Sequence, residues 1–266
     1  METTPLQQAA DLLKKSQSIL LCLPQTLSTD AVASGIALHL ALTQQGKQAK
    51  LVSATTELPV SHAFLPNTTG ITADLDTLKK FVISVDTRRA PVSELSYDTT
   101  DGVLNIFLTP KSGAYATGDV STRTSQPTFD CAVTFDCQDL DHLGTVFEQN
   151  AELFYATPII NIDHSAANEH FGQVNVVDLV ATSVAEIVTD LLRVIDPKMV
   201  SNDIATALLT GMIAKTKSFQ TPTVTPKSLT TASELVVAGA KREDIVRNLF
   251  QTKSLSVLKL WGRALA

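Results

Sequence analysis

The stretch SILLCLPQTLSTDAVASGIALHLALTQQG, residues 18–46, decides the fold class. It opens with an apolar run without alternation, which is typical of a strand buried on both faces of a parallel sheet. A polar loop follows, and Asp30 is predicted to be the N-cap of a long apolar run of helical period that stops at Gly46. A buried strand joined directly to a helix is the building unit of α/β sheets. The stretch therefore predicts the first strand and the first helix of an α/β domain.

Similar apolar runs recur along the chain and alternate with helical patterns. The runs occupy residues 49–54, 81–86, 131–136, 158–163 and 174–178, and helices are predicted at 31–45, 184–195, 226–238 and 241–251. Several of the runs are apolar throughout, as strands buried on both faces should be. The alternation predicts an α/β fold: a doubly wound, mostly parallel sheet with helices on both faces.

One segment departs from this alternation. The apolar residues 103–109 follow Asp101-Gly102 and, together with residues 94–97, predict a β-hairpin that turns on Asp-Gly. Residues 113–128 are rich in Gly, Ser and Thr and predict a loop. We therefore expect one domain over residues 1–255, with an inserted hairpin and loop at about 90–128.

The composition excludes several classes of protein. The chain has 266 residues, 21 Lys and Arg against 27 Asp and Glu, a net charge of −6 and 44% hydrophobic residues. It is too apolar to be disordered and too acidic to hold nucleic acid by charge alone. The first residues lack the basic region and apolar run of a signal peptide, no apolar run approaches the ~18 residues of a membrane span, and no C-x-x-C pair is present. These features predict a cytoplasmic protein that does not contact membranes.

Four of the apolar runs end in aspartate, namely Asp86, Asp136, Asp163 and Asp178. The carboxyl ends of parallel strands meet at one edge of an open sheet, where such folds bind ligands. His164 follows one of these aspartates, and Asp30 follows the first strand. Carboxylates beside an imidazole are ligands that suit Mn²⁺ or Mg²⁺, and two such ions ~4 Å apart activate water for phosphodiester hydrolysis.

Four segments in order resemble the motifs of the DHH-family phosphoesterases, which include oligoribonucleases and nucleotide-bisphosphate phosphatases. They are PQTLSTDA at 24–31, FDCQDLDHLG at 135–144, DHS at 163–165 followed by NEHFG at 168–172, and TGMIAKTKSF at 210–219. The resemblance extends over most of the chain. It implies the family's fold, its phosphoester hydrolysis and a pair of Mn²⁺ ions bridged by the carboxylate at Asp136.

The departures from the family pattern fall on the ligands that the resemblance implies. Asp30, Asp136, Asp163 and His164 are kept, but Pro24, Ser28, Ser165 and Lys215 stand where the family has His, Asp, His and Asp. Proline offers no side-chain ligand, and a protonated lysine repels a metal ion. We therefore expect no metal cofactor, and we expect Lys215 to compensate the remaining carboxylates in an ion-pair network. The alternative is a single weakly held Mn²⁺ or Mg²⁺ on Asp30, Asp136 and His164.

These departures predict a catalytically inactive domain with no assigned catalytic residue. It would act as a nucleotide- or phosphate-binding or scaffold module, with Lys215, Lys217 and Ser165 binding phosphate and a nucleotide or short oligonucleotide as partner. Two alternatives stay open: a slow Mn-dependent phosphodiesterase or phosphatase acting on short oligonucleotides or nucleotides, and an assembly protein whose hairpin pairs with a second copy or another protein. Residues 256–266 resemble the connector to the family's second domain, which is expected to be missing.

Overall fold

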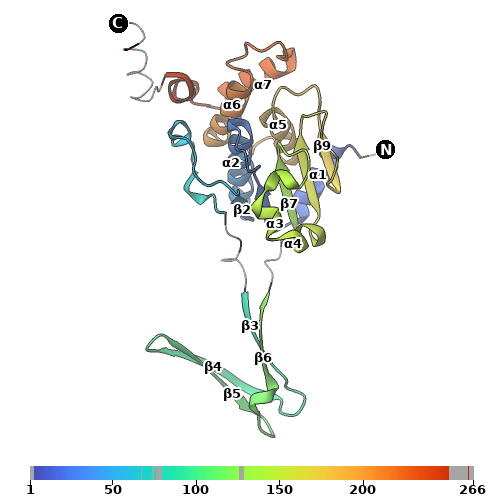
Figure 1. Ribbon diagram of the computed structural model, residues 1–266, viewed down its shortest axis with the longest axis vertical. Coiled ribbons are helices and arrows are strands. Elements are labelled where there is room, and N and C mark those ends of the chain that lie inside the picture. Colours follow the sequence, from blue (N-terminus) through green and yellow to red (C-terminus); the bar gives the residue numbers. More distant parts are fainter. Residues whose placement is uncertain are drawn as a thin grey trace. The chain divides into compact units, whose positions relative to one another are not determined.

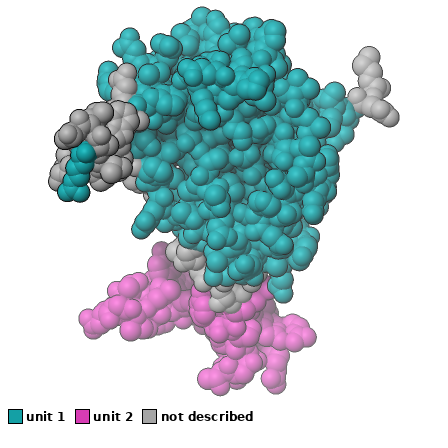
Figure 2. Space-filling view, turned by 45° about the horizontal axis from the view of Figure 1, so that its top comes forward, with its two compact units in different colours: residues 1–75, 128–266 teal, residues 76–127 magenta. Residues whose placement is uncertain are grey.

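The computed structural model describes residues 3–66, 68–73, 75, 80–125, 129–251 and 263. The chain divides into two compact units, which Figure 2 shows in separate colours: residues 1–75 with 128–266, and residues 76–127. Apart from Arg263, the connector predicted at 256–266 lies outside the described residues. Each unit is described by itself below.

The larger unit is built on a five-stranded parallel sheet in the order β2-β1-β7-β8-β9 (Figure 1). The strands are β1 Ser18–Cys22, β2 Gln48–Val52, β7 Cys131–Phe135, β8 Ile159–Asp163 and β9 Val174–Val177. Every residue of β7 and β8 is buried, as is β1 after its first residue. This burial is why these strands are apolar without alternation. The predicted α/β fold class, with a mostly parallel sheet, is confirmed.

Helices surround this sheet (Figure 1). They are α1 Pro5–Lys15, α2 Thr29–Gln44, α3 Thr145–Glu148, α4 Ala151–Ala156, α5 Val184–Ile195, α6 Asn202–Lys215, α7 Pro226–Val237 and α8 Arg242–Val246. The β1–α2–β2 and β7–α3–α4–β8 crossovers run in opposite directions along the sheet, so right-handed connections place their helices on opposite faces. Among the described residues, no helix is both long enough and apolar enough to traverse a lipid bilayer.

The strand order reverses at β1, which pairs with β2 on one side and with β7 on the other. In open α/β sheets, the crevice at the carboxyl ends of the strands beside such a reversal is the usual ligand site. The loop that leads from β1 to α2 carries Ser28, and Asp136 follows β7 directly. The topology thus brings both residues to the edge of the sheet where a ligand is expected.

The smaller unit contains two separate antiparallel ribbons. One pairs β3 (Lys80–Val85) with β6 (Val120–Ser125), and the other pairs β4 (Val92–Thr100) with β5 (Val103–Pro110). Between β4 and β5, Asp101 and Gly102 have φ of 50° and 78°, the left-handed backbone that a two-residue hairpin turn requires. The predicted Asp-Gly hairpin is therefore confirmed.

Two other predictions for this region are wrong. The run at 81–86 was expected in the buried parallel sheet, but it forms most of β3, where Phe81 is 68% exposed. Residues 113–128 were expected to be a loop, but they contain β6, a Ser- and Thr-rich strand without the alternation that signals a strand. The smaller unit begins at residue 76, ahead of the insertion boundary expected near residue 90.

Candidate functional site

The loop after β1 supplies two polar side chains to the site. Ser28 is the N-cap of α2: its Oγ accepts a hydrogen bond from the Ala31 N–H at 3.0 Å and donates one to Asp136 Oδ2 at 2.8 Å. The prediction that Asp30 caps this helix is wrong. The carboxylate of Asp30 is buried and accepts hydrogen bonds from the N–H groups of Val184 and Ala185, at 2.7 and 3.0 Å. It therefore binds the first two N–H groups of α5, whose N-cap is Ser183, and ties α2 to that helix.

Burial has a large effect on the pKa of Asp30. Burial and the nearby Asp136 raise this pKa from 3.8 to about 6, against the two N–H groups and the more distant Lys215 cation, which lower it. Gly211 on α6 also lies close to this carboxylate, because a Cβ at this position would lie 2.7 Å from Asp30 Oδ1. Glycine is therefore the residue that lets α6 pack against this carboxylate.

Asp136 is the centre of the candidate site. It follows β7 with a φ of 55°, a left-handed backbone that Asp adopts more readily than most residues. Besides Ser28 on Oδ2, two groups lie near its Oδ1: His164 Nε2 at 3.8 Å and Lys215 Nζ at 4.0 Å. The structure thus brings together four of the residues that the sequence placed in the site, one from the start of α2 and the others from the ends of β7, β8 and α6.

Two neighbours of Asp136 differ in charge at neutral pH. Burial lowers the pKa of His164, and the Lys215 cation lowers it further, against the smaller effects of Asp136 and Asp163. The imidazole is therefore neutral at pH 7. Lys215 then supplies the positive charge nearest to Asp136, although its side chain is 36% exposed and solvent weakens the pair.

Asp163 has a different environment from Asp136. It is fully buried, and its Oδ1 accepts hydrogen bonds from the N–H groups of His164 and Ser165 at 2.7 and 3.1 Å. Its Oδ2 accepts one from Asn168 Nδ2 at 2.7 Å. These bonds hold the loop after β8 in shape. The amide of Asn161, an unusual polar residue within an apolar strand, donates to Asn168 Oδ1 at 2.8 Å, a supporting contact that the sequence did not reveal.

Three further predicted site residues have other surroundings. Pro24 is buried, and its carbonyl accepts from Ser53 Oγ at 3.4 Å. Ser165 Oγ accepts from the Ala167 N–H at 3.2 Å, and Lys217 is exposed just past the end of α6. Within the described part of the chain, neither Ser165 nor Lys217 forms a hydrogen bond or ion pair with Asp136.

A cleft of about 510 Å³ adjoins the site. It is lined by His164, Leu179, Val180, Ala181, Thr182, Lys215, Thr223 and Thr225. One cation, one neutral imidazole and several hydroxyl groups are therefore combined with an apolar wall, on which Leu179 and Val180 are 63% and 71% exposed. This combination suits an anionic ligand that also carries an apolar or aromatic part.

The donor set does not fit two divalent cations. Hydrogen bonds from backbone N–H groups engage both oxygens of Asp30, and three hydrogen bonds engage the carboxylate of Asp163. Asp136 faces an ammonium group, which cannot ligate a metal while protonated. Among the described residues, no group of three or more His, Cys, Asp and Glu side chains is arranged to hold a metal ion.

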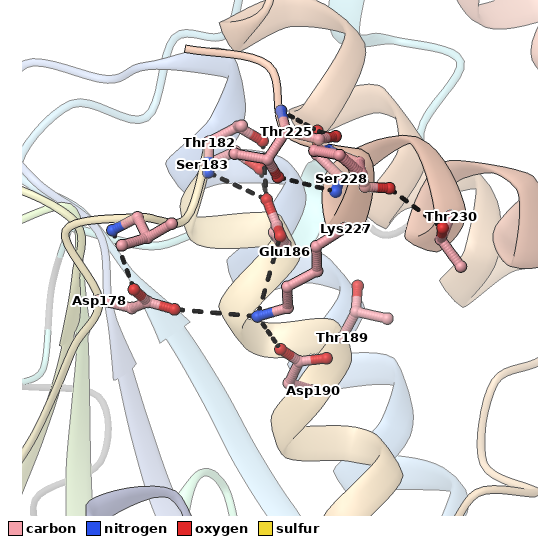
Figure 3. Close-up of polar contacts among 12 residues, drawn as sticks. Asp178, Thr182, Ser183, Glu186, Thr189, Asp190, Thr225, Lys227, Ser228 and Thr230 are labelled. Carbon is pink, nitrogen blue, oxygen red and sulfur yellow. Dashed lines mark hydrogen bonds and ion pairs between the residues drawn. The ribbon is translucent and has the colours of Figure 1, made fainter.

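The other two strand-end aspartates do not join the contacts of Asp136. Asp178 follows β9 at the same edge of the sheet, where its N–H donates to the Asp163 carbonyl at 3.1 Å, but Asp86 does not belong to this sheet. Asp86, in the smaller unit, is paired with Arg88. Asp178 belongs to a separate cluster around Lys227 of α7, whose Nζ lies 2.7 Å from Asp190, 3.8 Å from Asp178 and 3.9 Å from the buried Glu186 (Figure 3). This cluster joins α7 to α5 and is distinct from the contacts of Asp136.

The α/β fold of this chain is shared with a protein of known structure. An exopolyphosphatase-related protein from Bacteroides fragilis matches 98% of this chain with a TM-score of 0.72 and 18% identity, and the match covers 64% of that protein. At this identity, the likeness shows a shared fold. No protein-family profile matches the chain.

Two curated relatives are similar in sequence. A bifunctional oligoribonuclease and PAP phosphatase from Thermus thermophilus is 34% identical over 108 residues, which make up 41% of this chain and 33% of that protein. A probable enzyme of the same description from Streptococcus mutans is 36% identical over 78 residues, 29% of this chain and 25% of that protein. The matches thus span a third or less of each relative. Together, the comparisons support the resemblance to DHH-type phosphoesterases.

Proposed function

We propose that this chain is a DHH phosphoesterase-like protein that has lost two-metal catalysis and binds a nucleotide or short oligonucleotide through its phosphate. One observation carries the proposal: the Lys215 ammonium lies 4.0 Å from Asp136, where the resemblance implies a metal-ligating aspartate, and it also lines the cleft. A group that repels metal ions and attracts phosphate thus lies between the acidic centre and a cavity open to ligands.

The chemistry of the cleft supports a phosphorylated ligand. Asp136 compensates only part of the Lys215 charge, because the pair is long and partly solvated. A phosphate in the cleft would gain a charge-assisted hydrogen bond from this ammonium, and the hydroxyl groups of Thr223 and Thr225 also line the cleft. The exposed Leu179 and Val180 provide an apolar surface for a base. Ser165 and Lys217 are the proposed additional phosphate contacts.

Calorimetry with AMP in metal-free buffer tests this function. We expect the wild-type protein to bind AMP and Lys215→Met to bind it about tenfold more weakly, the size of one lost charge-assisted hydrogen bond. Lys198→Met is the matched control, because it removes an exposed lysine just after α5 and should leave the affinity unchanged. If both lysine variants bind AMP as tightly as the wild type, Lys215 is not the phosphate-binding residue.

A hydrolysis assay on the wild-type protein distinguishes an inactive binding module from a slow enzyme. Incubation with the dinucleotide pApA and Mn²⁺ should give no hydrolysis above that of a buffer control. Turnover that requires Mn²⁺ and disappears in Asp136→Asn would contradict the loss of catalysis and favour the metal-dependent phosphodiesterase.

A further inference from the structure

The β4–β5 ribbon has two chemically different faces. Directly paired residues of neighbouring antiparallel strands point to the same face, and faces alternate along the strand. The register pairs Leu95 with Leu108, Tyr97 with Ile106 and Thr99 with Leu104. These six residues form the apolar face of the ribbon, and none of them is charged. The opposite face carries Glu94, Ser96, Asp98, Thr100, Val103, Asn105, Phe107 and Thr109, which include both acidic residues of the two strands.

The apolar face is exposed to an unusual degree. Tyr97 is 73% exposed, Leu95 64%, Leu104 56% and Ile106 42%. A two-stranded ribbon alone is at best marginally stable in water, and such ribbons gain stability when their apolar face is packed against other structure. A contiguous apolar patch of this kind marks an interaction surface in soluble proteins.

We propose that the apolar face binds the same face of a second copy of this chain. The charge pattern favours this occupant, because a face without charged residues can meet an identical face without opposing like charges. The side-chain sizes also complement each other. A two-fold axis across the strands at Tyr97 would set Leu95 of one copy against the smaller Thr99 of the other.

The area of the face sets the expected strength of the contact. A ribbon eight residues long spans ~26 Å, and two strands with their side chains are ~10 Å wide. Two such faces together bury on the order of 500–600 Å², below the ~1,200 Å² at which stable complexes begin. We therefore expect a weak dimer that forms reversibly as the protein concentration rises.

Sedimentation of two matched lysine variants tests the dimer. Ile106→Lys places a charge in the apolar face, and Asn105→Lys places the same charge on the opposite face beside Asp98. Over roughly 1–500 µM, the average mass of the wild type and of Asn105→Lys should rise from 28.5 kDa towards twice that value. Ile106→Lys should dimerise at least tenfold more weakly. A wild type that stays monomeric, or an Ile106→Lys variant that associates like Asn105→Lys, would overturn the proposal.

Cross-linking identifies the contacting face independently of affinity. The three native cysteines, Cys22, Cys131 and Cys137, are all buried, and burial raises the pKa of each thiol, so they react slowly. With a short bismaleimide, Tyr97→Cys should give a covalent dimer, and Asp98→Cys, its neighbour on the opposite face, should not. Equal cross-linking of both variants would show random collision and argue against the face.

Discussion

Replacing Asp30 by alanine is expected to leave the protein about 3 kcal/mol less stable than replacing it by asparagine, because alanine leaves buried N–H groups without an acceptor. Both substitutions remove the buried charge, so the comparison leaves it out and measures the side-chain atoms that bind Val184 and Ala185 and fill the space beside them. Asparagine keeps one oxygen for them, and alanine keeps none and also leaves a void against Gly211. Urea unfolding of the two variants at pH 7 measures the difference. Equal stabilities would mean that the carboxylate does not hold α2 to α5.

The same residue should give wild-type stability a recognisable pH dependence. Folding raises the pKa of Asp30 from 3.8 to about 6, so the folded state binds its proton more tightly than the unfolded state. The stability that the raised pKa of Asp30 adds to the folded state is then fully present below pH 3.8 and is lost as the pH rises through 6. The loss is at most about 3 kcal/mol, since each pKa unit corresponds to 1.36 kcal/mol. Wild type should therefore weaken relative to Asp30→Asn between pH 4 and 7, and a constant difference in unfolding free energy would contradict this assignment.

Local sequence signals predicted the strands of the parallel sheet, but they did not predict which strand a given apolar run pairs with. The run at 18–23 and the helix that follows are recognisable because their periods and stop signals are local. The apolar run at 81–86 satisfies the same rule, yet it pairs with β6, some 40 residues later. Its local sequence does not distinguish a strand of the core sheet from a strand of a two-stranded ribbon. Apolar content alone therefore does not identify the sheet that a strand joins.

The same limit applies to the site. The resemblance places Ser28, Asp136 and Lys215 in one site, and the strand order explains how residues so far apart meet at one edge. The partner of Asp30 was misassigned because its hydrogen bond reaches Val184, 154 positions away, whereas capping rules consider only the adjoining helix. The Asn168 amide likewise donates to the Cys137 carbonyl, which lies 31 positions away in the chain.

Restoring the family's ligands is expected to create a metal site in this protein. The triple variant Pro24→His, Ser28→Asp, Lys215→Asp changes two of the side chains that contact Asp136 now: Ser28 on Oδ2 and Lys215 near Oδ1. Carboxylates in these positions would lie beside opposite oxygens of Asp136 and repel it unless cations neutralise them. The variant should therefore be less stable than the wild type without metal and should recover when Mn²⁺ is added.

Thermal unfolding with and without Mn²⁺ measures this recovery. Metal at a hundredfold excess over its dissociation constant stabilises by about 2.7 kcal/mol, and at ~2–4 °C per kcal/mol this raises the Tm of the triple variant by roughly 5–10 °C. The matched triple Pro24→Ala, Ser28→Ala, Lys215→Met removes the same side chains without adding ligands and should not respond, nor should the wild type. If Mn²⁺ raises the Tm of the wild type by a similar amount, the result would favour a single ion held by Asp30, Asp136 and His164. If the Tm of the first triple variant does not change with Mn²⁺, residues 24, 28 and 215 do not occupy the ligand positions. The added carboxylates would then be present without the geometry that metal binding requires.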